Sequence, residues 1–321
     1  MIKKIHSTLT AALCLLLLSG EARAAALIPV GQVVGLELRN DSVSIAAFDD
    51  TLGDTARKAG LQIGDEILDI DGTAVDNAAD VRQALTRSDG QIRLRVLRKE
   101  KEHRLQLTPR ITPSGPRMGV YLRQGVTGIG TVTFYDPASR RIGTLGHSVN
   151  DSKGDPVTMS GGTVYAASVL SVKRGKCGDP GQLRGGVDSG EPLGNIEKNT
   201  PQGVFGTVEA GFTGDTLETA HRSQVHTGAA TIRSTVTGGS PQEYSVEILK
   251  IYPGNRPEGR NMLLKVTDPT LLNTTGGIVQ GMSGSPIIQD GKLVGAVTHV
   301  LVNDPTAGYG IFIENMLDAA A

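Results

Sequence analysis

The residues best suited to covalent chemistry lie in the run GMSGSP at residues 281–286. A serine hydroxyl is a weak nucleophile, so a reactive serine must stand on a sharp, exposed turn beside a general base. Glycines on both sides of Ser283 permit such a turn, and they let main-chain N–H groups face a developing oxyanion. We therefore predict that Ser283 attacks a carbonyl carbon and that the N–H groups of Gly281 and Ser283 stabilise the oxyanion. The alternative is an inert turn between two strands.

An attacking serine needs an imidazole to accept its proton, and His147 has the most favourable context. It follows the strand pattern of residues 142–146 and precedes Ser283 by 136 residues, an interval that suits a base and a nucleophile carried by successive β-barrels. We predict that His147 is the general base. Of the remaining histidines after the leader, His103 is predicted to lie on the surface and His299 at a strand end. His221 and His226 could form a metal-binding pair, but their spacing is a weak signal.

A third group must accept the other ring N–H of the base and hold its tautomer. Asp268 lies fifteen residues before Ser283 at a strand-to-turn junction, and Asp151 lies four residues after His147. Spacing alone leaves both open. Asp304 is predicted to cap a turn or to line a substrate pocket. Cys177 is an alternative nucleophile, but it lacks the turn that a nucleophile requires.

The elements around these residues are mainly β. Forty-two glycines, no tryptophan and 3% aromatic residues indicate many turns and a core of Val, Ile, Leu and Ala. Asp290-Gly291 between two apolar runs predicts a two-residue hairpin, and residues 230–236 and 244–251 predict another. A short helix is expected over residues 313–320. This spacing of short strands favours barrels or sandwiches over alternating strand and helix units.

The N-terminal part carries a second pattern. Two basic residues, an apolar run over residues 9–18 and an A-x-A site predict an export signal within residues 1–26, with an uncleaved anchor as the alternative. The net charge of −1 argues against a nucleic-acid partner. The run AGLQIGDEILDIDG at residues 59–72 resembles a PDZ domain, which we place at residues 27–108. This resemblance implies a groove for an extended peptide; a degenerate PDZ domain that only packs against its neighbour is the alternative. The predicted carboxylate-binding loop is Val33, Val34, Gly35 and Leu36.

The run TPRITPSGPR at residues 108–117 is rich in Pro and Thr, and we predict a linker at residues 109–117. Residues 118–321 are predicted to form a chymotrypsin-like double β-barrel. The runs GIGTVTFYDPASRRIGTLGHSVND and TDPTLLNTTGGIVQGMSGSPIIQDGKLVGAVTHVLVNDPTAGYG resemble the sporulation stage IV B serine peptidase family, SpoIVB. This resemblance implies a His147, Asp268 and Ser283 triad, and so favours Asp268 over Asp151. It also implies the order of an N-terminal PDZ domain followed by a peptidase domain.

The resemblance further implies an exported serine endopeptidase that acts between the two forespore membranes. There, family members cleave a membrane-associated regulatory protein, which triggers maturation of a late sigma factor, and they cleave themselves ahead of the PDZ domain. The short segment between the predicted leader and Leu27 puts autoproteolysis in doubt. No metal or organic cofactor is expected. Two rival hypotheses are an exported PDZ adaptor with a non-catalytic peptidase-like domain and a general envelope quality-control protease.

Overall fold

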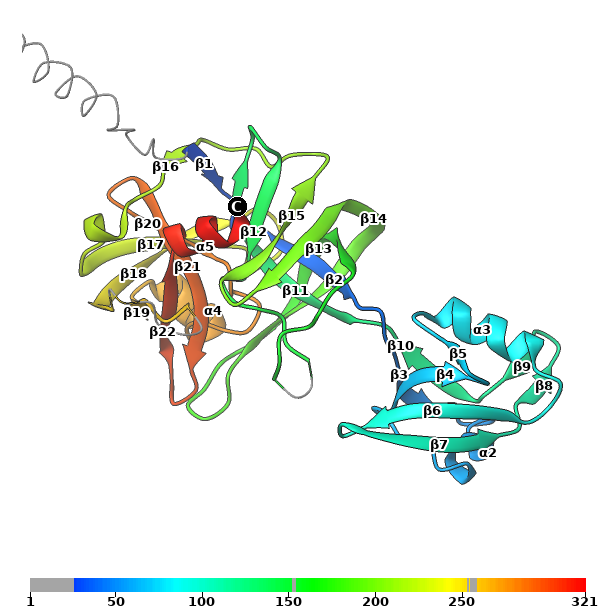
Figure 1. The fold of residues 1–321 in the computed structure, drawn as a ribbon. Helices are drawn as coiled ribbons and strands as arrows, with labels where there is room; N and C mark the ends of the chain where they lie inside the picture. The colour runs from blue at the N-terminus through cyan, green and yellow to red at the C-terminus, as the bar shows by residue number, and fades with distance from the viewer. Residues whose placement is uncertain (1–25, 152–153, 253, 255–258) are drawn as a thin grey trace, which may run out of the picture.

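The computed structural model describes residues 26–151, 154–252, 254 and 259–321, which form a larger body of two β-barrels and a smaller lobe joined to it by two short chain segments (Figure 1). Residues 1–25 of the predicted export signal lie outside the described residues. None of the helices in the described part of the chain is long and apolar enough to cross a membrane.

The first barrel closes because β11 pairs with β2 on one side and with β12 on the other. Going round the barrel, the strands follow the order β2, β11, β12, β15, β14 and β13, and β13 returns to β2. Two short strands extend the sheet beyond β11, β1 (Ala26–Pro29) and β16 (Leu217–Glu218). The barrel strands are β2 (Val33–Arg39), β11 (Val126–Asp136), β12 (Arg141–Thr144), β13 (Gly161–Lys173), β14 (Gln182–Thr200) and β15 (Gly203–Val208).

The second barrel is also closed, in the order β17-β18-β19-β22-β21-β20. Both predicted hairpins are confirmed: β17 pairs with β18, and β20 pairs with β21 across Asp290 and Gly291, both of which have positive φ. The predicted C-terminal helix is α5 (Ile313–Ala320). The other elements are β17 (Gly228–Ser234), β18 (Gln242–Ile251), β19 (Met262–Val266), β20 (Pro286–Gln289), β21 (Lys292–Leu301), β22 (Asp304–Phe312), α4 (Pro269–Thr275) and the single-turn η1 (Arg222–Gln224).

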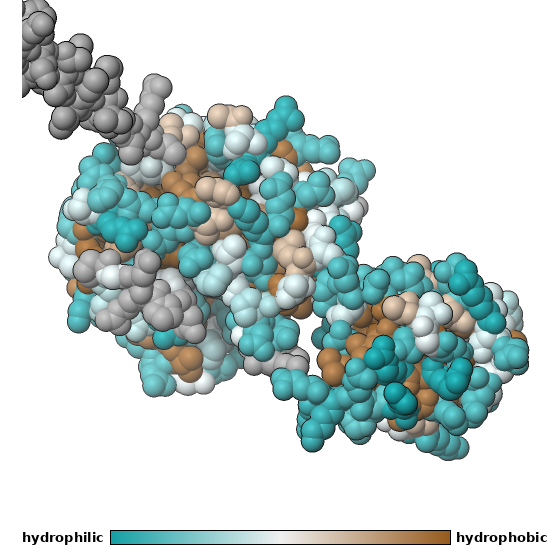
Figure 2. Space-filling view, in the orientation of Figure 1, coloured by the Kyte–Doolittle hydropathy of each residue, from teal (hydrophilic) through white to brown (hydrophobic). Residues whose placement is uncertain are grey.

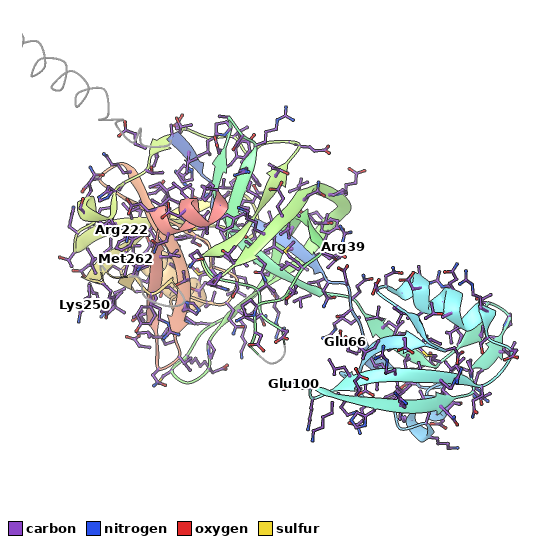
Figure 3. The ribbon with its side chains drawn as sticks, viewed as in Figure 1. Arg39, Glu66, Glu100, Arg222, Lys250 and Met262 are labelled. Carbon is purple, nitrogen blue, oxygen red and sulfur yellow. The ribbon has the colours of Figure 1, made fainter. Side chains whose placement is uncertain are left out.

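Buried side chains join the two barrels into one body. Val33 and Leu183 of the first barrel pack in one apolar cluster with the interior of the second, which includes Met262 (Figure 3). The amphipathic helix α5 lies over both barrels and buries Ile313 and Met316 against aromatic residues of the first. Arg222, labelled beside this helix in Figure 3, binds Glu314 at 2.7 Å. The face shown in Figure 2 is largely hydrophilic on both lobes.

The smaller lobe is the PDZ domain, a sheet in the order β10-β3-β4-β6-β7 with helices α2 and α3. Its buried Asp65 accepts two hydrogen bonds from Arg98, each 2.7 Å long, and one from the N–H of Gln62. The elements are β3 (Val43–Phe48), α2 (Asp54–Lys58), β4 (Glu66–Ile70), β5 (Thr73–Ala74), α3 (Ala78–Arg87), β6 (Ile92–Arg98), β7 (Lys101–Leu107), β8 (Arg110–Thr112), β9 (Gly115–Arg117) and β10 (Val120–Arg123).

The PDZ domain is inserted into the first barrel, which corrects the predicted domain boundaries. Strand β2 pairs with β11, with Leu38 opposite Val126, and the whole PDZ domain lies between these two strands in the sequence. The chain leaves the barrel after Arg39, at the end of β2, and Glu66 already belongs to β4 of the PDZ sheet (Figure 3). The predicted linker at 109–117 contains the β8–β9 hairpin, and β10 completes the PDZ sheet.

Candidate active site

The turn that carries Ser283 joins a loop to β20 and is held by its own main chain. The N–H of Met282 donates to Val279 O, and that of Gly284 donates to Val297 O. Gly281 and Gly284 have φ of +96° and +95°, a region in which a β-carbon is strained. A β-carbon at Gly284 would also lie 2.0 Å from Thr131 O. Because β11 of the first barrel packs so closely against the turn, only glycine fits at position 284.

Two threonines of β11 fix the turn from the opposite barrel. Thr131 donates its hydroxyl to Gly281 O at 2.8 Å and its N–H to Ser283 O at 3.1 Å. Thr133 donates its hydroxyl to Gly284 O at 2.7 Å. Both side chains are fully buried. The sequence analysis missed these residues, although alternating threonines in the otherwise apolar run TVTFY are a signal, since a buried hydroxyl requires a partner.

Two main-chain N–H groups of the turn differ from the others in their hydrogen bonding. Within the described residues, the hydrogen bonds of the turn involve the N–H groups of Met282, Gly284 and Ser285, whereas those of Gly281 and Ser283 make none. These are the two donors that the sequence predicted for the oxyanion hole. Their availability is what an oxyanion hole needs, because its donors must be directed at the reacting oxygen.

His147 follows β12 after two residues with positive φ, Leu145 and Gly146. Its ring is half-buried, and Nδ1 lies 2.8 Å from Ser148 O. A carbonyl oxygen can only accept, so Nδ1 carries the proton and Nε2 keeps its lone pair. This is the tautomer that a general base needs at Nε2.

Burial lowers the pKa of His147 below its usual value, and the hydrogen bond to Ser148 O offsets part of this effect. Burial acts in this direction because it disfavours the charged imidazolium. No charged side chain among the described residues contributes to the shift. His147 is therefore neutral near pH 7 and able to accept a proton.

Thr131 brings His147 and Ser283 to the same place between the barrels. Its N–H binds Ser283 O, and its carbonyl oxygen accepts from the N–H of Leu145, two residues before His147. On the other side, Ser283 Oγ donates to Thr298 O at 2.7 Å. A β-carbon at Gly146 would approach the methyl group of this same Thr298 within 2.8 Å. The structure thus gathers Ser283 and His147 around Thr131 and Thr298.

Asp268 is placed elsewhere. It caps the N-terminus of α4, where Oδ1 accepts from Leu271 N at 2.9 Å and Oδ2 from Ser245 N at 3.4 Å. Within the described residues the structure shows no contact between this carboxylate and His147, so the predicted orienting role is not supported by the geometry. The sequence contained the signal for the cap, since an aspartate followed by proline is typical of a helix start.

The other candidate residues have structural partners. Asp151 is exposed and accepts from the N–H of Asp155, and Asp304 accepts from Thr306 in the β21–β22 turn. The histidines of the suggested metal pair contact different carboxylates: His221 Nε2 lies 3.3 Å from Glu314, and His226 Nε2 lies 2.8 Å from Asp290. Cys177 is exposed between β13 and β14.

The predicted PDZ loop is wrong. Val33, Val34, Gly35 and Leu36 belong to β2, and β2 pairs with β11 on one side and β13 on the other. A strand paired on both edges cannot bind a peptide by strand addition. The assignment failed because a glycine-containing apolar run looks the same in a PDZ loop and in a barrel strand, and only the long-range pairing separates them.

A groove of the PDZ domain lies instead between α3 and β10, with a volume of about 580 Å³. Strand β10 is at the edge of the PDZ sheet and has one unpaired side. The groove has an apolar floor and two basic residues, Arg82 and Arg117, at its margin. Its apolar lining comes from the two elements that flank it and from the loop before β10: Val81, Leu85, Met118, Val120 and Leu122.

The fold and the site define a serine peptidase of two β-barrels with a PDZ domain. Residues 115–317 match the family described as SpoIVB peptidase S55, and residues 55–98 match a PDZ domain. The first match spans more than half of the chain, so the chain belongs to the SpoIVB peptidase S55 family. Strands β1 and β2 lie before both matched ranges, although β2 closes the first barrel and β1 extends its sheet.

Several solved structures are similar at low identity. The active form of the Rv3671c protease from M. tuberculosis is 17% identical, with 62% of this chain and 75% of that chain covered and a TM-score of 0.37. Its inactive form is 16% identical over 60% and 82%, with a TM-score of 0.35. The PDZ domain of an SdrC-like protein from Listeria monocytogenes is 21% identical over 26% and 87%, with a TM-score of 0.23. A search of the curated proteins finds no match.

Proposed function

We propose that this chain is an exported serine endopeptidase in which Ser283 is the nucleophile and His147 the general base. The observation that carries the proposal is the clustering of both residues around Thr131 and Thr298, with the N–H groups of Gly281 and Ser283 available beside the hydroxyl. Membership of a serine peptidase family supports the same reaction class.

In the proposed reaction, the Ser283 hydroxyl turns from Thr298 O to Nε2 of His147 and attacks the scissile carbonyl carbon. The hydroxyl proton passes to His147, which returns it to the leaving amine as the acyl-enzyme forms. Water then attacks the acyl group with His147 again acting as base. Ser148 O holds the Nδ1–H throughout, in place of a side-chain carboxylate. One oxyanion donor of the type predicted at Gly281 is worth about 2.7–4 kcal/mol of transition-state stabilisation.

The α3–β10 groove is proposed to bind a peptide by adding a strand to β10. The apolar floor suits an apolar last side chain, and the loop at residues 118–119, near Arg82 and Arg117, suits the terminal carboxylate. A groove on the PDZ domain gives the peptidase a second point of contact with its protein substrate or with a regulatory peptide.

The biological setting is proposed from the resemblance to the sporulation family. We propose export across the cytoplasmic membrane to the space between the forespore membranes, cleavage of a membrane-associated regulatory protein, and activation of a late sigma factor as the result. The hypothesis is tested by disrupting the chromosomal copy: loss of sigma-factor maturation supports it, and normal maturation contradicts it while leaving the peptidase chemistry open.

The peptidase chemistry is tested with a fluorophosphonate probe that labels activated serines. The wild-type chain is expected to be labelled, and Ser283→Ala is expected to lose all labelling. Ser285→Ala is the matched control, because Ser285 lies two residues away in the same motif with a fully buried side chain; it is expected to keep the label. A folded wild type that takes no label with or without a PDZ peptide contradicts the proposal and favours the adaptor hypothesis.

A further inference from the structure

The base His147 faces a second histidine. The ring centroids of His147 and His299 lie 5.1 Å apart with an interplanar angle of 38°. At this separation two rings are in packing contact. His299 comes from β21, in the second barrel, whereas His147 follows β12 of the first. The contact therefore spans the boundary between the barrels.

The backbone fixes the place of His299 relative to the nucleophile. His299 follows Thr298, whose carbonyl oxygen accepts the Ser283 hydroxyl. At this level β21 pairs with β22, where His299 lies opposite Tyr309, and its pairing with β20 ends at Ala296. Because the pairing with β22 and the hydrogen bond from Ser283 to Thr298 O hold this part of β21, the ring of His299 projects from a fixed segment and can hold a partner in place.

We propose that His299 is the positioning residue of the general base: its ring packs against the imidazole of His147 and shields it from water. This inference rests on the proposed function of His147. The first barrel fixes the Nδ1 side of the base through Ser148 O, and the second barrel covers its ring through His299. The role requires the size and flatness of the ring.

The groups around His147 are consistent with an uncharged support. Ser148, Thr298 and the Ser283 turn present main-chain oxygens and hydroxyls, and His299 is the titratable group in ring contact with the base. Among the described residues no carboxylate or cationic side chain shifts the pKa of His147.

Shielding has a measurable consequence. Burial is the main reason that the pKa of His147 is lowered. Removal of the His299 ring admits water, so the pKa of His147 rises toward its ordinary value. The base also loses one of its two supports, and a loosely held base transfers protons less efficiently.

The experiment compares His299→Ala and His299→Phe with the wild type on a peptide substrate and with the fluorophosphonate probe. The Ala variant is expected to lose at least tenfold in kcat with KM within twofold of wild type, and its acid limb is expected to move to higher pH. The Phe variant, which keeps a flat ring, is expected to retain kcat within about threefold. His226→Ala is the control, because His226 is exposed and binds Asp290.

A direct readout is the NMR titration of the His147 ring in the inactive Ser283→Ala background, where His299→Ala is expected to raise the His147 pKa and His299→Phe to leave it lowered. If His299→Ala fails to fold, His299→Leu replaces it as a variant that fills space without a ring. The proposal is overturned by an unchanged pKa and rate in the ringless variant, or by an equal loss in the Phe variant. A wild type that takes no label overturns the proposed function instead, so the two failures are distinguishable.

Discussion

Ser283 Oγ donates its hydrogen bond to Thr298 O at 2.7 Å, so in this structure the hydroxyl proton is directed at a main-chain carbonyl rather than at an imidazole. A hydroxyl has one proton, and this one must be released before His147 can accept it. The bond is a single neutral hydrogen bond, worth about 0.5–1.5 kcal/mol. Substrate binding can therefore displace it at small cost, and the arrangement describes a resting state of the site.

The first prediction concerns pH. The pKa of His147 lies below its ordinary value of 6.5, because burial disfavours the imidazolium. Labelling of Ser283 should be near its plateau at pH 7 and fall as the pH falls through this lowered pKa. Measuring the labelling rate from pH 4 to pH 8 tests this. An acid limb above pH 6.5 would show that the base is not shielded.

The same shift affects stability, with a sign that can be worked out. Below about pH 6.5 an unfolded imidazole binds a proton that the folded His147 does not yet bind, so the free energy of unfolding falls as the pH decreases from that value through the lowered pKa. His147→Gln removes this group. Chemical denaturation at several pH values should therefore show a smaller loss of stability in this range for the variant than for the wild type.

The second prediction concerns the threonines that hold the nucleophile turn. Thr131→Val removes the buried hydroxyl that donates to Gly281 O and leaves this half-buried carbonyl without its side-chain partner. We expect a loss of about 1–3 kcal/mol in the free energy of unfolding and a lower kcat. Thr133→Val should destabilise by a similar amount with a smaller effect on kcat, because its partner Gly284 O lies on the far side of Ser283 from Gly281.

Urea denaturation and single-turnover acylation measure these two effects separately. Equal stability losses with a larger decrease of kcat for Thr131→Val are the expected outcome. If both variants acylate at the wild-type rate, the turn is held well enough by its own main chain, and the role given to β11 is incorrect.

The third prediction separates a helix cap from a catalytic acid. Asp268→Ala removes the acceptor for Leu271 N and should cost about 0.5–2 kcal/mol of stability. Asp268→Ser keeps a capping oxygen but has no charge, so it should recover most of the stability and label Ser283 at close to the wild-type rate. A stable Asp268→Ser protein that has lost its labelling by several orders of magnitude would return Asp268 to the triad.

Local patterns predicted much of this structure, and long-range pairings explain what they missed. The Asp290-Gly291 turn and the helix at 313–320 follow from turn residues and periodicity, which act within a few residues. The nucleophile turn could be recognised for the same reason. The insertion of the PDZ domain could not, because β2 meets β11 across about 90 intervening residues and nothing in either strand encodes its partner.

The residues of the candidate site also fall into those that local sequence could predict and those that depend on long-range pairing. Ser283 and His147 were recognisable from the residues beside them, but their supports come from distant strands: Thr131 from β11 and His299 from β21. Resemblance to the family assigned Asp268 to the triad, whereas the adjacent proline already indicated a cap. Segment 109–117 was assigned to a linker because short Pro- and Gly-rich strands resemble one until they pair. Residues 118–123 were assigned to the peptidase domain because their pairing with β3 of the PDZ sheet is long-range.

The fourth prediction tests the new position of the peptide groove. Arg82 lies exposed on α3 at the margin of the groove, whereas Arg87, on the same helix, lines a different hollow. Arg82→Glu should weaken binding of a peptide with an apolar last residue and a free carboxylate by about three- to tenfold, since exposed ion pairs contribute about 0.2–1 kcal/mol and reversal adds repulsion. Arg87→Glu is the matched control and should bind normally.

Fluorescence anisotropy with free-acid and amidated forms of one peptide measures this effect. The difference between the variants should vanish for the amidated form and shrink at high salt, because surface charges are screened. Val34→Glu makes the contrasting case: Val34 is fully buried in the first barrel, so this change should unfold the peptidase body instead of removing a peptide contact. A folded Val34→Glu protein that has lost only peptide binding would restore the loop at Val33 to Leu36 as the binding site.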